Sequence, residues 1–212
     1  MYKGIIFDID CTLTSTNQLI FKSFNHIAEK YLGKTFTDEE IISLFGPTED
    51  VILERLCGEN YEDAKADYYN FYRENHHMAD LYPGIPELLQ EIKRKNVLLS
   101  IFTGKGRQAS LITLEELDIL SYFDFIVSGD DVNNHKPSSE GLLKFINEFN
   151  LSKDEVLMVG DSVSDVTASK EAGIQIASAM WDNYSPEIVK TMGSDYYFYS
   201  VSELYQFLSE RI

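Results

Sequence analysis

The sequence predicts a three-layer α/β protein with a parallel sheet, interrupted by a small all-helical segment after its first strand. Two observations support this prediction. Short, continuous apolar runs alternate with helical segments along most of the chain, as expected for strands that helices cover on both faces. The stretch from residue 15 to about residue 80, in contrast, has helical patterns and no convincing strand. Strands that alternate with helices indicate a parallel sheet with right-handed crossovers.

Five apolar runs are the predicted strands, and each stops at polar or turn residues. They are GIIFDID (4–10), VLLSIFTG (97–104), FDFIVSGDD (123–131), EVLMVGDS (155–162) and GIQIASAM (173–180). Pro86 opens the helix before the second run, because proline is favoured in the first turn of a helix. Ser152 and Glu155 have the spacing of a capping box, but an apolar run follows directly, so we expect a loop there.

The inserted segment is predicted as a series of helices. The first repeats apolar residues at helical spacing in NQLIFKSFNHIAEKYLG and ends at Gly33, and the second begins with a capping box of Thr37 and Glu40. Helical patterns then run from Thr48 to Cys57 and from Tyr61 to about His77. The predicted domains are an α/β core of residues 1–14 and 82–212 and a helical cap of residues 15–81.

The composition excludes several classes of partner. A net charge of −17 argues against nucleic acids and anionic membrane surfaces, which need basic patches. No apolar run approaches the ~20 residues of a membrane span, and the start, MYKGIIFDID, lacks the features of a secretory peptide. The two cysteines form no CxxC pattern, so we expect neither a disulfide framework nor a zinc site. A cytoplasmic protein is the resulting expectation.

Polar residues follow the predicted strands where parallel sheets bind their ligands, at the carboxyl ends. They are Asp8, Asp10, Thr103, Lys136 and Asp161. Asp8 and Asp10 share one face at a strand end, where two carboxylates repel each other unless a cation or a proton intervenes. Each residue alone is also typical of a helix cap, a turn or a solvated loop. Their occurrence at successive strand ends indicates one site.

These residue types suit phosphoryl transfer. Asp8 could attack phosphorus to give an aspartyl phosphate, and Asp10 could protonate the leaving oxygen and then deprotonate the attacking water. The oxygens of Asp8 and Asp161, with the backbone carbonyl of Asp10, would suit Mg²⁺. The candidates for holding the phosphate and balancing its charge are Thr103, the following amide of Gly104, and Lys136.

Four motifs in order resemble the haloacid dehalogenase superfamily, in the branch with a helical cap inserted after the first motif. They are DIDCTLT, IFTGKG with Thr103, HKPSSE with Lys136, and GDSVSD. The resemblance implies a Rossmann-like core, with Asp8 as nucleophile, Asp10 as acid and base, and Asp161 as a Mg²⁺ ligand. It implies phosphate binding by Thr103, charge stabilisation by Lys136, and a place for Asp165 behind the metal ligands or against Lys136. An acid at position 10 favours P–O chemistry over C–halogen or C–P chemistry.

Within this family, TSTNQLI…FGP and DDVNNHKP look like phosphoglycolate phosphatases and the related inorganic pyrophosphatases. We expect a Mg²⁺-dependent phosphatase, monomeric or homodimeric, that hydrolyses a small phosphomonoester such as phosphoglycolate. An inorganic pyrophosphatase, a sugar phosphomutase of the β-phosphoglucomutase type, and a non-catalytic phosphate-binding module are the alternatives. Sequence cannot separate a phosphatase from a mutase, because the difference depends on how well water is kept from the aspartyl phosphate.

The helical cap should act as a lid that excludes water and supplies specificity. Candidate substrate contacts are the loop FGPTED (45–50) and the side chains of Lys105 and Arg107, just after Thr103. Each of these is also typical of a solvated surface.

Three further residues carry expectations. His76 and His77 lie about 100° apart on a helix, so they form no i,i+4 metal pair, and we expect both on the surface. Cys11 stands in the first motif where glycine is commonest in the family. Other members have bulky residues there, so we expect that the turn does not require glycine. We expect Cys11 near the entrance of the site and sensitive to oxidation.

Overall fold

Six parallel strands form the central sheet of the protein, which a computed structural model describes for residues 1–183 and 185–212. The strands are β1 (Gly4–Phe7), β4 (Leu98–Phe102), β5 (Phe125–Val127), β6 (Val156–Gly160), β7 (Gln175–Ala179) and β8 (Tyr196–Phe198). Their order across the sheet is β5-β4-β1-β6-β7-β8. The central strand β1 pairs with two neighbours, so that Phe7 lies beside Ile101 and Val159. All five predicted strands are confirmed, and β8 is an additional edge strand.

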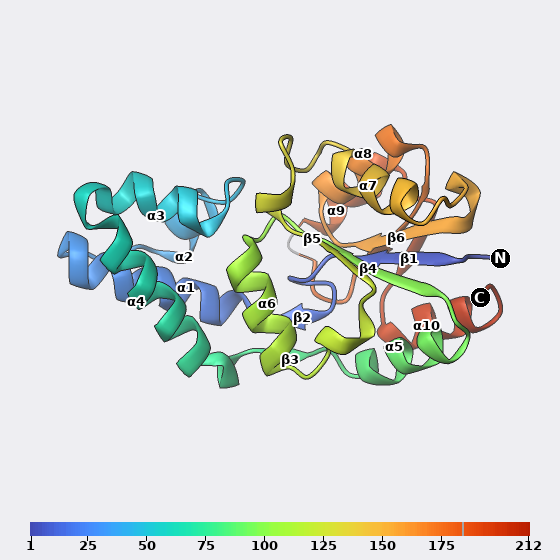
Figure 1. Ribbon diagram of the computed structural model, residues 1–212, viewed down its shortest axis with the longest axis horizontal. Helices are drawn as coiled ribbons and strands as arrows, with labels where there is room; N and C mark the ends of the chain where they lie inside the picture. The colour runs from blue at the N-terminus through green and yellow to red at the C-terminus, as the bar shows by residue number, and fades with distance from the viewer. Residues whose placement is uncertain (184) are drawn as a thin grey trace.

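Helices cover both faces of this sheet (Figure 1). Along β1, Ile5 and Phe7 pack with α5 and α10, whereas Ile6 packs on the other face with α7, α8 and α9. Because helices pack on both faces of the parallel sheet, the predicted three-layer α/β fold is confirmed. None of the helices in the described part of the chain is long and apolar enough to span a membrane. The helices of this layer system are α5 (Ile85–Arg94), α6 (Arg107–Glu116), α7 (Glu140–Glu148), α8 (Val163–Ala172), α9 (Pro186–Met192) and α10 (Val201–Ser209).

The remaining helices form the inserted segment, on the left in Figure 1. They are α1 (Asn17–Ile27), α2 (Asp38–Ile42), α3 (Glu49–Cys57) and α4 (Tyr61–Glu74). The apolar core of these inserted helices includes Phe24 and Tyr68, together with Ile112 of α6. The hydroxyl groups of Tyr72 and Thr113 lie 2.9 Å apart and join α4 to α6. Helix α6 therefore provides the surface on which the inserted helices pack.

A short antiparallel ribbon joins the two connections to the insertion. Strand β2 (Thr14–Ser15) pairs with β3 (Asp80–Leu81). The prediction that residues 15–80 contain no strand is therefore wrong at its two ends, because two-residue strands are too short to produce a pattern. The proposed domain boundary at 14/15 falls within this ribbon and the one at 81/82 at its end, and both stay a prediction.

The structure tests two capping boxes that the sequence suggested. The capping box of Thr37 and Glu40 begins α2 as predicted. The prediction of a loop without a capping box at residues 152–155 is wrong, because Ser152 and Glu155 do form a capping box around a single 3-10 turn before β6. A capping box satisfies backbone donors in one turn as well as in a long helix, so the apolar run that follows did not exclude it.

The two histidines after α4 have different environments. His77 is exposed, as expected. His76 is only 4% exposed, and its ring packs edge-on against Tyr72 with 5.3 Å between ring centroids. The expectation of a surface position is therefore wrong for His76, because the chain turns back after α4 and buries one ring of the pair.

Candidate active site

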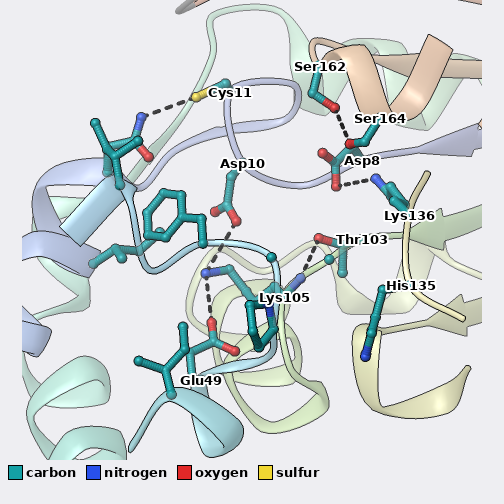
Figure 2. A pocket seen from close by; sticks show the side chains of 18 of the residues that line it. Asp8, Asp10, Cys11, Glu49, Thr103, Lys105, His135, Lys136, Ser162 and Ser164 are labelled. Atoms are coloured by element: carbon teal, nitrogen blue, oxygen red, sulfur yellow. Dashed lines mark hydrogen bonds and ion pairs between the residues drawn. The ribbon is translucent and has the colours of Figure 1, made fainter. Parts of the chain in front are cut away.

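Most of the predicted site residues meet at the carboxyl edge of the sheet, where they line one cavity of about 340 Å³. They are Asp8, Asp10, Thr103, Gly104, Lys105, Lys136 and Asp161. Asp8 follows β1, Thr103 follows β4, and Asp161 follows β6; Asp10 and Lys136 approach from loops (Figure 2). Parallel strands place their carboxyl ends at one edge, which explains why residues so far apart in sequence come together.

Lys136 joins two of the carboxylates. Its Nζ lies 2.6 Å from Asp165 Oδ1 and 3.1 Å from Asp8 Oδ1. Burial disfavours the charged form of Lys136, but the negative charges of Asp165 and Asp8 outweigh this effect and raise the pKa of Lys136. Asp165 is fully buried and accepts hydrogen bonds from the amide and hydroxyl of Ser162. Gly160 permits this packing, because a Cβ there would overlap the Asp165 carboxyl group.

Three carboxylates form a site that fits a divalent cation. Asp8, Asp161 and Asp165 each offer an oxygen, and these atoms lie within 4.8 Å of one another. Among the described residues, Asp8 Oδ1 is buried without a hydrogen-bond partner, although it lies near Lys136. Burial, with the charge of Asp165, raises the pKa of Asp161 well above its usual range. Asp165 is held by Lys136 and Ser162, whereas the Asp161 carboxylate accepts a long hydrogen bond of 3.3 Å from Thr12, so Asp8 and Asp161 are the candidates for Mg²⁺ ligands.

The surroundings of the nucleophile candidate oppose each other in their effect on its acidity. Burial raises the pKa of Asp8 to about 6, although the ammonium group of Lys136 opposes the shift and Asp165 adds to it. Lys136 therefore supplies a neighbouring positive charge that favours the carboxylate form needed for a nucleophile.

Asp10 has a separate set of partners. The hydroxyl of Thr16 donates a hydrogen bond to its Oδ1, and Lys105 Nζ lies 3.3 Å from its Oδ2. Lys105 Nζ also lies 3.5 Å from Glu49 Oε1, so this ammonium group stands between two carboxylates (Figure 2). Burial opposes the charge of Lys105, but Asp10, Tyr72 and Glu49 raise its pKa well above its usual range. The predicted Lys105 thus lies in the cavity wall and not on a solvated surface.

Glu49 is a carboxylate of the inserted helices that contacts the core at the site. It lies in the first turn of α3, is 7% exposed, and its Oε2 accepts a hydrogen bond from the Gly106 amide at 2.6 Å. The loop 45–50 was predicted to contact the site, but nothing in its pattern distinguished Glu49 from its neighbours. The cavity lining also includes other residues that the motifs did not single out: Asn17, His135, Ser162 and Ser164.

Arg107 was predicted as a substrate contact, but it does not line the cavity. Its guanidinium lies 2.7 Å from Asp131, and its side chain is 49% exposed. Arg107 begins α6, and this places its side chain on the outer surface, two residues beyond the buried Lys105. The alternative of a solvated surface position is therefore the correct one for Arg107.

Cys11 lines the cavity with a backbone φ of 59°, in the left-handed region that favours glycine. A cysteine nevertheless adopts this conformation, in agreement with the expectation that the turn does not require glycine. The thiol is 6% exposed and accepts a hydrogen bond from Asn17 at 3.2 Å. Burial, with Asp161 and Asp10 nearby, raises the pKa of Cys11, so little thiolate forms and the expected sensitivity to oxidation has no support.

The parallel sheet, the inserted helices and the acidic cavity at the carboxyl edge define a Rossmann-like α/β protein with a helical insertion at its site. The chain belongs to the haloacid dehalogenase-like hydrolase family, whose model matches residues 5–179. It is 31% identical over 201 residues to a pyrophosphatase, PpaX, of Halalkalibacterium halodurans, covering 94% of each protein. This family membership confirms the expectation of a phosphatase enzyme.

Solved structures show the same fold. A predicted phosphoglycolate phosphatase from Haemophilus somnus superposes with a TM-score of 0.85 at 21% identity, covering 98% of each chain. CbbY from Rhodobacter sphaeroides, in complex with phosphate, superposes with a TM-score of 0.83 at 23% identity, covering 96% of each chain. These similarities extend over both the sheet and the inserted helices.

Proposed function

We propose that this protein is a Mg²⁺-dependent phosphatase that hydrolyses a small phosphomonoester through an aspartyl phosphate on Asp8. The observation that carries this proposal is the separation of two neighbouring carboxylates into different environments. Asp8 pairs with Lys136 in the acidic cluster, whereas Asp10 is held by Thr16 and Lys105. Two carboxylates with different partners can take different roles in one reaction.

In the first step, an Asp8 carboxylate oxygen bonds to phosphorus as the bond from phosphorus to the ester oxygen breaks. Asp10 gives its proton to that leaving oxygen, so the alcohol departs neutral. Thr103, the Gly104 amide and Lys136 lie in the cavity where they can bind the phosphate oxygens and balance their charge.

In the second step, Asp10 takes a proton from water, and the resulting hydroxide attacks phosphorus and releases Asp8 and inorganic phosphate. The oxygens of Asp8 and Asp161, with the backbone carbonyl of Asp10, would hold Mg²⁺. When bound, this cation neutralises negative charge on the nucleophile and on the phosphate. Asp165 keeps Lys136 in place by the 2.6 Å ion pair.

Pyrophosphate hydrolysis is the second candidate function, and similarity to PpaX favours it. The same two steps apply, with phosphate in place of the alcohol as leaving group. Release of phosphate from pyrophosphate and from 2-phosphoglycolate, each compared at equal concentration, separates this candidate from the phosphomonoesterase.

The test of the proposed mechanism is phosphate release from p-nitrophenyl phosphate with and without Mg²⁺. We expect Asp8→Asn to lower the rate by at least about a thousandfold, because the substituted amide is a poor nucleophile. Asp154→Asn is the matched control, since Asp154 is exposed in the turn before β6, away from the cavity. Turnover of Asp8→Asn at the control's rate, or no Mg²⁺-dependent turnover at all, would contradict the proposal.

A further inference from the structure

The inserted helices give the cavity an apolar wall. This wall comes from α1, from the segment at the end of α2 and from α3. Its side chains are Ile20, Phe21, Phe24, Ile42, Phe45, Pro47 and Ile52. The acids and lysines at the carboxyl edge of the sheet line the same cavity. One cavity thus combines a polar end suited to phosphate with an apolar wall that the proposed hydrolysis does not use.

Two large apolar side chains of this wall are exposed. Ile42 is 42% exposed and Phe45 is 44% exposed, and both line the cavity. Exposed apolar side chains gathered at a concave surface mark a binding site, because water contact there is unfavourable until a ligand covers it.

The cavity contains more carboxylates than lysines, and this excess of negative charge disfavours a second anionic group on the substrate. Among the described lining residues, four are carboxylic acids: Asp8, Asp10, Glu49 and Asp161. The two lining lysines are already engaged, since each lies within 3.5 Å of two carboxylates. With one bound Mg²⁺ and one phosphate dianion, these four ionised acids and two lysines still carry an excess of negative charge, and a further carboxylate or phosphate on the substrate would add to it.

We propose that the substrate is a phosphomonoester of an apolar alcohol, with no second anionic group. This inference rests on the proposed function and narrows its substrate. The phosphate occupies the end of the cavity at Asp8 and Lys136, and the apolar part of the alcohol lies against Phe21 and Phe45. Release then follows the two steps above, with the apolar alcohol leaving with the proton from Asp10.

The test is kcat/KM in Mg²⁺ for ethyl, butyl and hexyl phosphate, whose alcohols are similar as leaving groups. Burial of each added methylene should raise kcat/KM about two- to fourfold. Hexyl phosphate should also exceed 2-phosphoglycolate and pyrophosphate, which carry a second anionic group. The inference is overturned if kcat/KM does not rise along the alkyl series, or if kcat/KM is highest for 2-phosphoglycolate or pyrophosphate. Either outcome leaves the phosphatase proposal standing.

Variants assign the effect to the wall. Phe45→Ser should lower the ratio of hexyl to ethyl phosphate hydrolysis toward one, because it removes apolar contact area. Ile188→Ser is the matched control, since Ile188 is 56% exposed on α9 and does not line the cavity. Equal ratios in the two variants overturn the inference. Absence of Mg²⁺-dependent hydrolysis of every compound overturns the proposed function, and this narrower inference with it.

Discussion

Two lysines at the site are each held between two carboxylates, and this decides which substitutions the site tolerates. Lys136 bridges Asp165 and Asp8, and Lys105 bridges Asp10 and Glu49. Both side chains are nearly buried, so the charges gain from pairing but lose hydration. Removal of either lysine would leave two neighbouring carboxylates without their shared cation. The lysines therefore stabilise the arrangement of the acids.

A buried histidine gives a prediction about pH. Burial lowers the pKa of His76, with Glu116 opposing the shift and Lys105 adding to it. The unfolded chain, with a histidine pKa of about 6.5, therefore binds the proton more readily than the fold. The stability that neutral His76 contributes is complete above that pH and is lost as the pH falls toward its folded pKa. We expect His76→Phe to make Tm fall less steeply than in the wild type between about pH 7.5 and about pH 5.

The matched control for this prediction is His77→Phe, because His77 is the exposed neighbour of His76. Tm is measured by circular dichroism across the same pH range for both variants. We expect His77→Phe to keep the wild-type slope. Parallel slopes for all three proteins would show that His76 does not contribute to the acid sensitivity.

At the scale of single residues, sequence could predict side chains whose position follows from a strand end. Asp8, Asp161 and Thr103 are of this kind, because a parallel sheet fixes where its strands end. Glu49 could not be predicted as a partner of Lys105, because their contact depends on how the inserted helices pack against the core. Arg107 illustrates the same limit, since two positions along the backbone separate a buried lysine from an exposed arginine.

Some helices and strands could likewise be predicted from the sequence, and others could not. The five apolar runs were long enough to predict strands, and the capping box of Thr37 and Glu40 correctly placed the start of α2. The ribbon of β2 and β3 has two residues a strand, and β8 has three, so neither produces a recognisable alternation. These elements depend on pairing with distant segments and not on local pattern.

Helix α3 gives a prediction at this scale, because Glu49 in its first turn bonds to the core at Gly106. A hydrogen bond to a charged group contributes about 1.5–3 kcal/mol, and its loss would favour separation of the inserted helices from the core. We expect Glu49→Ala to lower kcat/KM about tenfold or more. Glu49→Gln should fall between Glu49→Ala and the wild type, because its amide oxygen can still accept from Gly106.

Asp50→Ala is the matched control for Glu49→Ala. Asp50 is the next residue on α3, but its partners Lys65 and Tyr69 both belong to α4 within the insertion. Its removal therefore leaves the contact between insertion and core intact, and kcat/KM should stay within about twofold of the wild type. Equal losses in the two variants would mean that Glu49 acts only by stabilising the inserted helices.

For the whole molecule, the acidic balance of the chain predicts that cation binding stabilises the fold. The net charge is −17, and the cavity at the carboxyl edge adds a local excess of carboxylates over lysines. Burial raises the pKa of both Asp8 and Asp161, which means that the ionised pair is unfavourable without a cation. A ligand that binds the folded state alone raises its stability in proportion to the logarithm of ligand excess.

Magnesium should therefore raise Tm. At about 100 times its Kd, the added free energy of unfolding is about 2.7 kcal/mol, or about 5–10 °C for a chain of this size. Asp161→Asn should abolish most of this rise, because it removes a coordinating carboxylate. Asp10→Asn should retain the rise while losing turnover, since only the backbone carbonyl of Asp10 is assigned to the metal. The measurement is thermal unfolding with and without Mg²⁺, and loss of the rise in Asp10→Asn would place the Asp10 carboxylate itself on the metal.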